Sequence, residues 1–310
     1  MVLFVTGRCN RTCWYCPLGS ERKDRDAIFA NEKRVSSIEE IVQEAEVMSA
    51  LGTGVTGGEP LLVLDRVVEF CSNLKERFGK EHHIHLYTGS APQEADLRRL
   101  AGLVDEIRLH PPQELWPRIL DTPYARSLRW AREMGFDVGI EVPALPGLED
   151  LAPALPLLDF LNINELEWGE VSGDAMRSRG LVPVDSLHNA VKNSHRWAAP
   201  LRRHAKVHWC SSSFKDSVQL RERLKRIARN TARPFDEVTE DGTIVYGVIE
   251  IDSIDPMDLP LLTRIPWERN GGHIEMGWKA LRRNSQKLPG NKYIVERYPN
   301  GGIIVEVTPL

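Results

Sequence analysis

The sequence lacks a long hydrophobic run, an excess of one charge and a large set of cysteines. No apolar stretch approaches the length of about 20 residues that spans a bilayer. The first residues, MVLFVTGRCN, carry no basic leader before their short apolar run, so we expect no secretory signal. Lys and Arg number 40 and Asp and Glu 44, which excludes a polycation built to coat nucleic acid. Five cysteines are an odd number, which argues against a secreted disulfide scaffold and favours a cytoplasmic protein.

Three of the five cysteines nevertheless fall within eight residues. Cys9, Cys13 and Cys16, hereafter the cysteine triplet, form the run C-N-R-T-C-W-Y-C. Chance would give roughly 0.001 such triplets in a chain of this composition, so the spacing indicates a site. Three thiolates favour an iron–sulfur cluster in which one iron has no protein ligand and can take a substrate or cofactor. A zinc site stays open as an alternative, although no second C-x2-C or H-x3-H pair lies nearby to complete it.

A second motif, Gly57-Gly58-Glu59-Pro60, follows a segment with the pattern of a strand end. Its two glycines would let the backbone approach a ligand closely. Glu59 would offer a carboxylate that accepts hydrogen bonds from an ammonium group. Taken alone, the motif is equally well explained as a turn.

Together these features resemble the radical S-adenosylmethionine (radical SAM) superfamily, since Tyr15 also precedes the third cysteine. The resemblance implies that the cysteine triplet binds a [4Fe–4S] cluster. It also implies that the methionine part of S-adenosylmethionine (SAM) chelates the fourth iron. Glu59 and the adjacent backbone would then contact the methionine amino group, and Tyr15 would lie near the adenine.

The alternation of strands and helices predicts an α/β fold. Strands separated by helical patterns of about 10 or more residues indicate βα units and a parallel sheet. Six or seven units fit residues 1–214, close to the partial (βα)6-type, TIM-like barrel of the resembled superfamily. The expected strands are 2–6, 54–56, 84–88, 106–110, 138–142, 165–168 and 207–210. The expected helices are 36–48, 62–78, 94–101, 124–134, 151–160 and 186–204.

The ends of the parallel strands are expected to carry the chemistry. The segments L-Y-T-G at 86–89 and V-P-A-L-P-G at 142–147 resemble strand-end motifs of activase-like members, although the first lacks their asparagine. Arg108 and His110 fall where such enzymes place polar contacts to SAM. The residues expected to contact the cofactor are Tyr15, Gly57, Gly58, Glu59, Pro60, Thr88, Arg108, His110 and Glu141.

Two further residues at expected strand ends, Cys210 and Glu167, are candidates for a catalytic role. Cys210 could donate a hydrogen atom, carry a covalent intermediate or ligate a second metal, or it could be a buried structural thiol. Glu167 could act on a substrate or could be a solvated carboxylate. Cys71 lies in a helical pattern and is expected to be buried. The charged run 21–26 is expected to be a solvated loop that could cover the site.

Residues 215–310 break the βα rhythm and predict a small α+β domain. An Asp-Gly turn indicates a hairpin over 238–246, and a second hairpin is expected over 293–307. A helix is expected at 276–285. Between 201 and 233, ten Lys and Arg residues face two acidic ones, which fits either a solvated linker helix over 218–228 or a face that binds RNA.

The resemblance implies an oxygen-sensitive enzyme that cleaves SAM reductively and generates a 5′-deoxyadenosyl radical for hydrogen abstraction. A flavodoxin or a ferredoxin would supply the electron. A small metabolite or cofactor precursor is the favoured substrate. The alternatives are RNA, such as tRNA, and a protein target, as for glycyl-radical activases. A zinc-binding interaction module is the non-enzymatic alternative.

Overall fold

A nine-stranded sheet organises the first part of the chain. The computed structural model describes residues 1–250, 262–300 and 302–310. Residues 1–46 with 50–215 form one unit, and residues 47–49 with 216–310 form a second. The sheet of the first unit has the order β3-β2-β1-β4-β5-β6-β7-β8-β9. Its strands are β1 (Val2–Phe4), β2 (Ile28–Ala30), β3 (Lys33–Val35), β4 (Gly52–Thr56), β5 (His83–Thr88), β6 (Glu106–Leu109), β7 (Asp137–Pro143), β8 (Phe160–Asn164) and β9 (Val207–Cys210).

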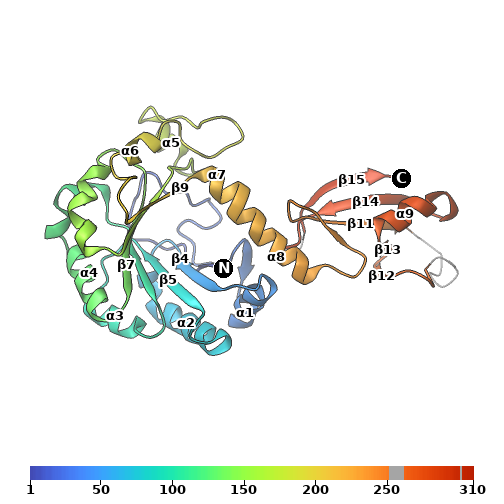
Figure 1. The fold of residues 1–310 in the computed structure, drawn as a ribbon, viewed down its shortest axis with the longest axis horizontal. Helices are drawn as coiled ribbons and strands as arrows, with labels where there is room; N and C mark the ends of the chain where they lie inside the picture. Colours follow the sequence, from blue (N-terminus) through green and yellow to red (C-terminus); the bar gives the residue numbers. More distant parts are fainter. Residues whose placement is uncertain (251–261, 301) are drawn as a thin grey trace. The chain divides into compact units, whose positions relative to one another are not determined.

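From β1 through β4 to β9 all neighbouring strands are parallel, which confirms the predicted partial barrel. The hairpin β2–β3, which the sequence did not predict, pairs antiparallel with β1. The helices of this unit are α1 (Ile38–Val47), α2 (Leu64–Phe78), α3 (Glu94–Leu100), α4 (Pro123–Glu133), α5 (Gly173–Arg177), α6 (His195–Ala198) and α7 (Ser212–Phe214). Figure 1 shows α2, α3 and α4 outside the curved sheet.

The strands separate an apolar outer face from a polar inner one because successive side chains point to opposite sides. In β5, Ile84 and Leu86 are fully buried in the hydrophobic core, whereas His85 and Tyr87 line a cavity. The same alternation in β6 buries Ile107 and turns Arg108 toward the cavity. The strands therefore place polar groups inside the barrel while their apolar side chains join the core.

Three predicted elements were wrong. The strand expected at 165–168 is instead β8 at Phe160–Asn164, whose register with β7 and β9 buries Leu161 and Ile163. The helix expected at 186–204 shrinks to α6, because Asn193 adopts a left-handed φ of 67° and residues 190 and 191 form bridges. The proline-interrupted helix expected at 151–160 is a 3₁₀ helix, Leu148–Leu157, and it ends earlier than expected because Phe160 begins β8.

The second unit contains an antiparallel sheet of order β12-β13-β11-β14-β15, with β10 paired to β11. Both predicted hairpins are present, as β10–β11 and β14–β15. The strands are β10 (Glu237–Val238), β11 (Ile244–Glu250), β12 (Trp267–Asn270), β13 (His273–Met276), β14 (Lys292–Arg297) and β15 (Ile304–Pro309). A π-helix (Lys215–Leu220) leads into α8 (Arg221–Thr231), and α9 (Trp278–Asn284) packs on β11. In the described ranges, no helix is both long and apolar enough to cross a membrane.

Candidate active site

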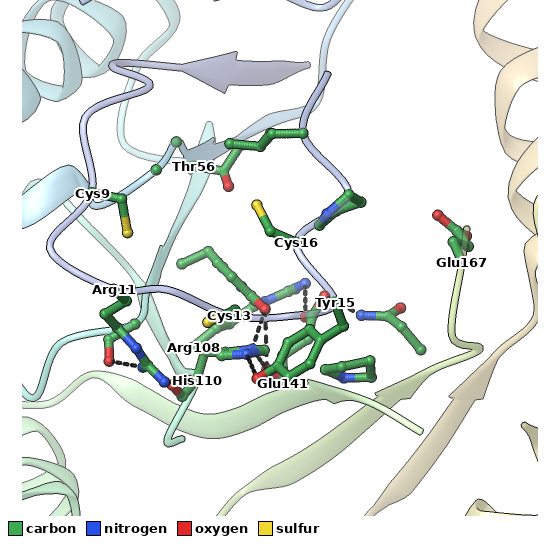
Figure 2. A pocket seen from close by; sticks show the side chains of 18 of the residues that line it. Cys9, Arg11, Cys13, Tyr15, Cys16, Thr56, Arg108, His110, Glu141 and Glu167 are labelled. Atoms are coloured by element: carbon green, nitrogen blue, oxygen red, sulfur yellow. Dashed lines mark hydrogen bonds and ion pairs between the residues drawn. The ribbon is translucent and has the colours of Figure 1, made fainter. Parts of the chain in front are cut away.

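The cysteine triplet lies on the loop between β1 and β2, hereafter the cysteine loop (residues 7–26). All three thiols are free, partly buried and in the lining of one cavity of about 410 Å³. Figure 2 shows their sulfur atoms around one open space of this cavity. Burial raises the pKa of Cys9 and of Cys16, so these thiols are protonated at neutral pH and would have to lose protons to bind a metal.

This donor set fits a polynuclear cluster better than a single ion. A tetrahedral zinc site needs sulfur atoms about 3.8 Å apart, because each Zn–S bond is about 2.3 Å long. Over the residues that the structure describes, no group of three or more His, Cys, Asp or Glu side chains is placed to hold one metal ion. Thiols spread around a cavity suit a cluster in which each sulfur binds a different iron.

Arg11, which the sequence analysis missed, fastens the cysteine loop to the barrel. Its Nη1 donates to the carbonyl oxygens of Gly89 (2.5 Å) and His110 (2.7 Å) and to the Tyr124 hydroxyl (3.4 Å). The two carbonyls follow the ends of β5 and β6. An arginine inside the triplet was visible in the sequence, but its partners lie 78 and 99 residues away.

The two glycines of the second motif touch the cysteine loop. A Cβ on Gly57 would lie 2.6 Å from the Thr6 carbonyl oxygen, and one on Gly58 would lie 2.4 Å from that of Arg8. The Gly58 amide donates to the Thr6 carbonyl at 2.7 Å. The glycines are therefore required where β4 meets the cysteine loop, and both also line the cavity.

Glu59 is almost fully buried and holds the end of β4 to the end of β5. Its Oε1 accepts from the Leu61 amide (3.0 Å) and the Thr88 hydroxyl (2.6 Å), and its Oε2 accepts from the Ser90 amide (2.7 Å). Three of about four acceptor positions are thus filled by the chain itself. Pro60 is buried at the first turn of the following 3₁₀ helix.

Glu59→Gln is expected to lower the free energy of unfolding by about 1–3 kcal/mol, because an amide NH₂ would then face one of these three buried donors. Urea unfolding of the metal-free protein measures this. Glu94→Gln, at an exposed position on α3, is the matched control. Equal stability of the two variants would contradict the bridging role of Glu59.

A second carboxylate, Glu141 on β7, lines the cavity and accepts hydrogen bonds from three side chains. Its Oε2 accepts from Arg108 (2.9 Å) and Asn162 (3.0 Å), and its Oε1 accepts from Asn164 (2.9 Å). Burial raises the pKa of Glu141, but Arg108 and the two asparagines outweigh it, so the pKa is lowered. Glu141 is therefore ionised. Arg108 forms ion pairs with two carboxylates, those of Glu106 and Glu141.

His110 connects the hydroxyl groups of Tyr15 and Tyr87, and Figure 2 shows His110 and Tyr15 close together. Its Nε2 lies 2.9 Å from the Tyr15 hydroxyl, and its Nδ1 lies 2.5 Å from the Tyr87 hydroxyl and 2.9 Å from the Glu141 carbonyl oxygen. Because a carbonyl can only accept, Nδ1 carries the proton and Nε2 accepts from Tyr15. Burial, aided by Arg11, lowers the pKa of His110 to about 4, so the ring is neutral at pH 7.

The buried histidines predict acid sensitivity. Burial also lowers the pKa of His85 to about 3 and lowers that of His82. Their ordinary pKa is about 6.5, so the unfolded chain binds more protons than the folded one below that pH. The free energy of unfolding should therefore have its full value above pH 6.5. As the pH decreases toward 4, it should fall by up to about 1.4 kcal/mol per pH unit for each histidine.

Urea titrations of the metal-free protein between pH 7 and 5 measure this slope. His85→Gln should reduce the slope, whereas His83→Gln, at an exposed strand end, should keep it. A pH-independent stability over this range would contradict neutral burial of these rings.

Most of the predicted site residues line one cavity. Those in its lining are Cys9, Cys13, Tyr15, Cys16, Gly57, Gly58, Arg108, His110, Glu141 and Glu167. Those outside its lining are Glu59, Pro60, Thr88 and Cys210. Glu167 forms an ion pair with Lys215, at 2.8 Å, that sequence analysis missed. Burial raises the pKa of the partly buried Cys210, and Cys71 is buried in α2 as expected.

Comparison with known proteins assigns the family. The family model described as "Radical SAM superfamily" matches residues 3–152, and a model described as a domain of unknown function matches residues 242–310. A relative from Methanocaldococcus jannaschii, provisionally named a glycyl-radical enzyme activating enzyme, is 38% identical over 339 aligned residues. The match covers 100% of this chain and 89% of that protein. The chain belongs to the radical SAM superfamily.

As a radical SAM enzyme of the activase-like branch, it uses a [4Fe–4S] cluster and SAM. Solved structures with some likeness include the radical SAM methyltransferase TsrM of Kitasatospora setae (16% identity, TM-score 0.40) and methylornithine synthase (15%, 0.41). The matches cover 57% and 56% of this chain, and 38% and 54% of the others. This radical SAM chain thus spans about half or less of their lengths, and their substrates are properties of those proteins alone.

Proposed function

We propose that this radical SAM enzyme binds SAM and a small metabolite or cofactor precursor together in the barrel cavity. A [4Fe–4S] cluster held by the cysteine triplet would, once reduced, supply the electron for cleavage of SAM to methionine, so that the adenosyl part could take a hydrogen atom from the substrate. The observation that carries the proposal is the cavity of about 410 Å³, which has the size of a small-molecule site and contains the cysteine triplet in its wall.

The roles of the chain's own residues follow from their contacts. The cysteine triplet would hold the cluster, and the Gly57-Gly58 backbone and Tyr15 would lie against SAM from two sides. Arg108 and Glu141 would present an ion pair to the bound ligands, and His110 would hold the Tyr15 hydroxyl in place by a hydrogen bond. Glu59, Pro60 and Thr88, which lie outside the cavity lining, would position the strand ends beside SAM. Cys210 and Glu167 are proposed to act toward the substrate.

The proposed domain division is a catalytic barrel over 1–214 and a C-terminal α+β domain over 215–310. An electron donor is required, and we propose a flavodoxin or a ferredoxin. An RNA substrate has less support, because several basic residues between 201 and 233 are engaged within the chain. Lys206 donates to two backbone carbonyls, Lys225 pairs with Glu240, and Arg233 pairs with Asp236.

A protein substrate is the second candidate, favoured by the name of the relative that is 38% identical. Both candidates share one test. Anaerobically reconstituted protein should hold about four irons with matching sulfide and, with dithionite and SAM, release 5′-deoxyadenosine and methionine. One zinc with no sulfide would overturn the proposal. Adding either a deuterated metabolite extract or a deuterated protein extract then shows which fraction transfers deuterium into 5′-deoxyadenosine.

A further inference from the structure

One ion pair in the cavity wall is not needed by the cofactor site described above. Lys215 Nζ lies 2.8 Å from Glu167 Oε1, and both side chains line the cavity. Glu167 follows β8, and Lys215 begins the π-helix Lys215–Leu220. Single π-helical turns occur often at functional sites. Figure 2 shows Glu167 on the side of the cavity opposite Cys9.

The two side chains retain unused bonding capacity. The exposed fraction of the side chain is 30% for Lys215 and 27% for Glu167, so a ligand in the cavity can reach the pair. A lysine has three donors and a carboxylate about four acceptor positions, and the pair uses one of each. By contrast, Glu141 already accepts three hydrogen bonds, and Arg108 already pairs with both Glu106 and Glu141. Glu165 accepts from the Ser212 amide at 3.0 Å.

The charges around this pair balance. Lys23 and Asp24 line the same cavity, so its wall carries cations and anions together rather than one sign. A ligand with one charge would meet one attractive and one repulsive partner at the Lys215–Glu167 pair. A ligand with a carboxylate next to an ammonium group would give each side chain a new partner of opposite charge without leaving either unpaired.

We propose that Lys215 and Glu167 form the substrate subsite for a free α-amino acid, with the carboxylate on Lys215 and the ammonium group on Glu167. This inference rests on the proposed function. It restricts the proposed small-molecule substrate to zwitterions. The methionine part of SAM is also a zwitterion, so the experiment must separate the two ligands.

The test uses the reconstituted full-length enzyme with dithionite and SAM. Each of the common α-amino acids, deuterated on carbon, is added singly, and 5′-deoxyadenosine is followed for its rate of formation and its deuterium content. An amino acid that responds is compared with its N-acetyl and carboxamide derivatives, which each lack one charge. Lys215→Met and Glu167→Gln are the test variants. Arg98→Met and Glu94→Gln, from an exposed ion pair on α3, are the controls.

We expect at least one amino acid to transfer deuterium in the wild type, and neither derivative to replace it. Both test variants should raise its half-saturating concentration about 10- to 100-fold, while the controls match the wild type. SAM should still change the electron paramagnetic resonance spectrum of the reduced test variants. Loss of that change would assign the pair to SAM and overturn the inference, as would a wild type that cleaves SAM but responds to no amino acid. A wild type that does not cleave SAM would instead refute the proposed function itself.

Discussion

Cys13→Ala is expected to abolish SAM cleavage, lowering 5′-deoxyadenosine formation by more than about a thousandfold, because the chemistry belongs to a cofactor that we propose this thiol holds. Cys13 lies between the two other thiols in the cysteine loop and faces the same cavity. With two thiols left, iron content after reconstitution should fall well below that of the wild type. Iron and sulfide analysis with mass spectrometry of the nucleoside product measures both effects.

The control for this result is Cys71→Ala. Cys71 is fully buried in α2 and outside the cavity, and burial raises its pKa to about 12, so it is an inert thiol. This variant should keep the iron content of the wild type. If Cys13→Ala retained iron and turnover, or if Cys71→Ala lost iron equally, the assignment of the cluster to the triplet would fail.

Arg11→Ala should reduce iron retention and SAM cleavage by about 10- to 100-fold, the usual effect of removing a group that orients metal ligands. The guanidinium binds two carbonyl oxygens at strand ends, so its loss frees the middle of the cysteine loop and leaves those carbonyls without this donor. Arg11→Lys keeps the charge, but its ammonium group lies one bond short of the position of Nη1, which makes all three bonds, so it should restore the activity only in part.

Arg8→Ala is the matched control, because Arg8 lies in the same loop with 62% of its side chain exposed and pairs with Asp26 at 3.5 Å. Iron content and the resonance spectrum of the reduced protein should remain those of the wild type in this control. A fully loaded, wild-type-like Arg11→Ala protein would show that the loop holds its shape without the guanidinium.

Local patterns were sufficient for most of the barrel and for the cofactor motifs. The alternation in β5 and the spacing of the cysteine triplet depend on neighbours in sequence, so both could be predicted. The positions of Arg11 and Lys215 could not, because each acquires its role from partners far along the chain. Asn193 misled the helix prediction for the same reason, since one left-handed residue interrupts an otherwise plausible helical segment.

Because the two faces of β5 meet different surroundings, mutations at its even-numbered and odd-numbered residues should have different effects. Even positions of β5, Ile84 and Leu86, join the core, and odd positions, His85 and Tyr87, line the cavity. In a library randomised along this strand, changes at even positions would be selected through protein yield, whereas changes at odd positions would be free to alter specificity. Changes to the cavity wall could thus be sought along one side of a strand while the apolar core on its other side stays intact.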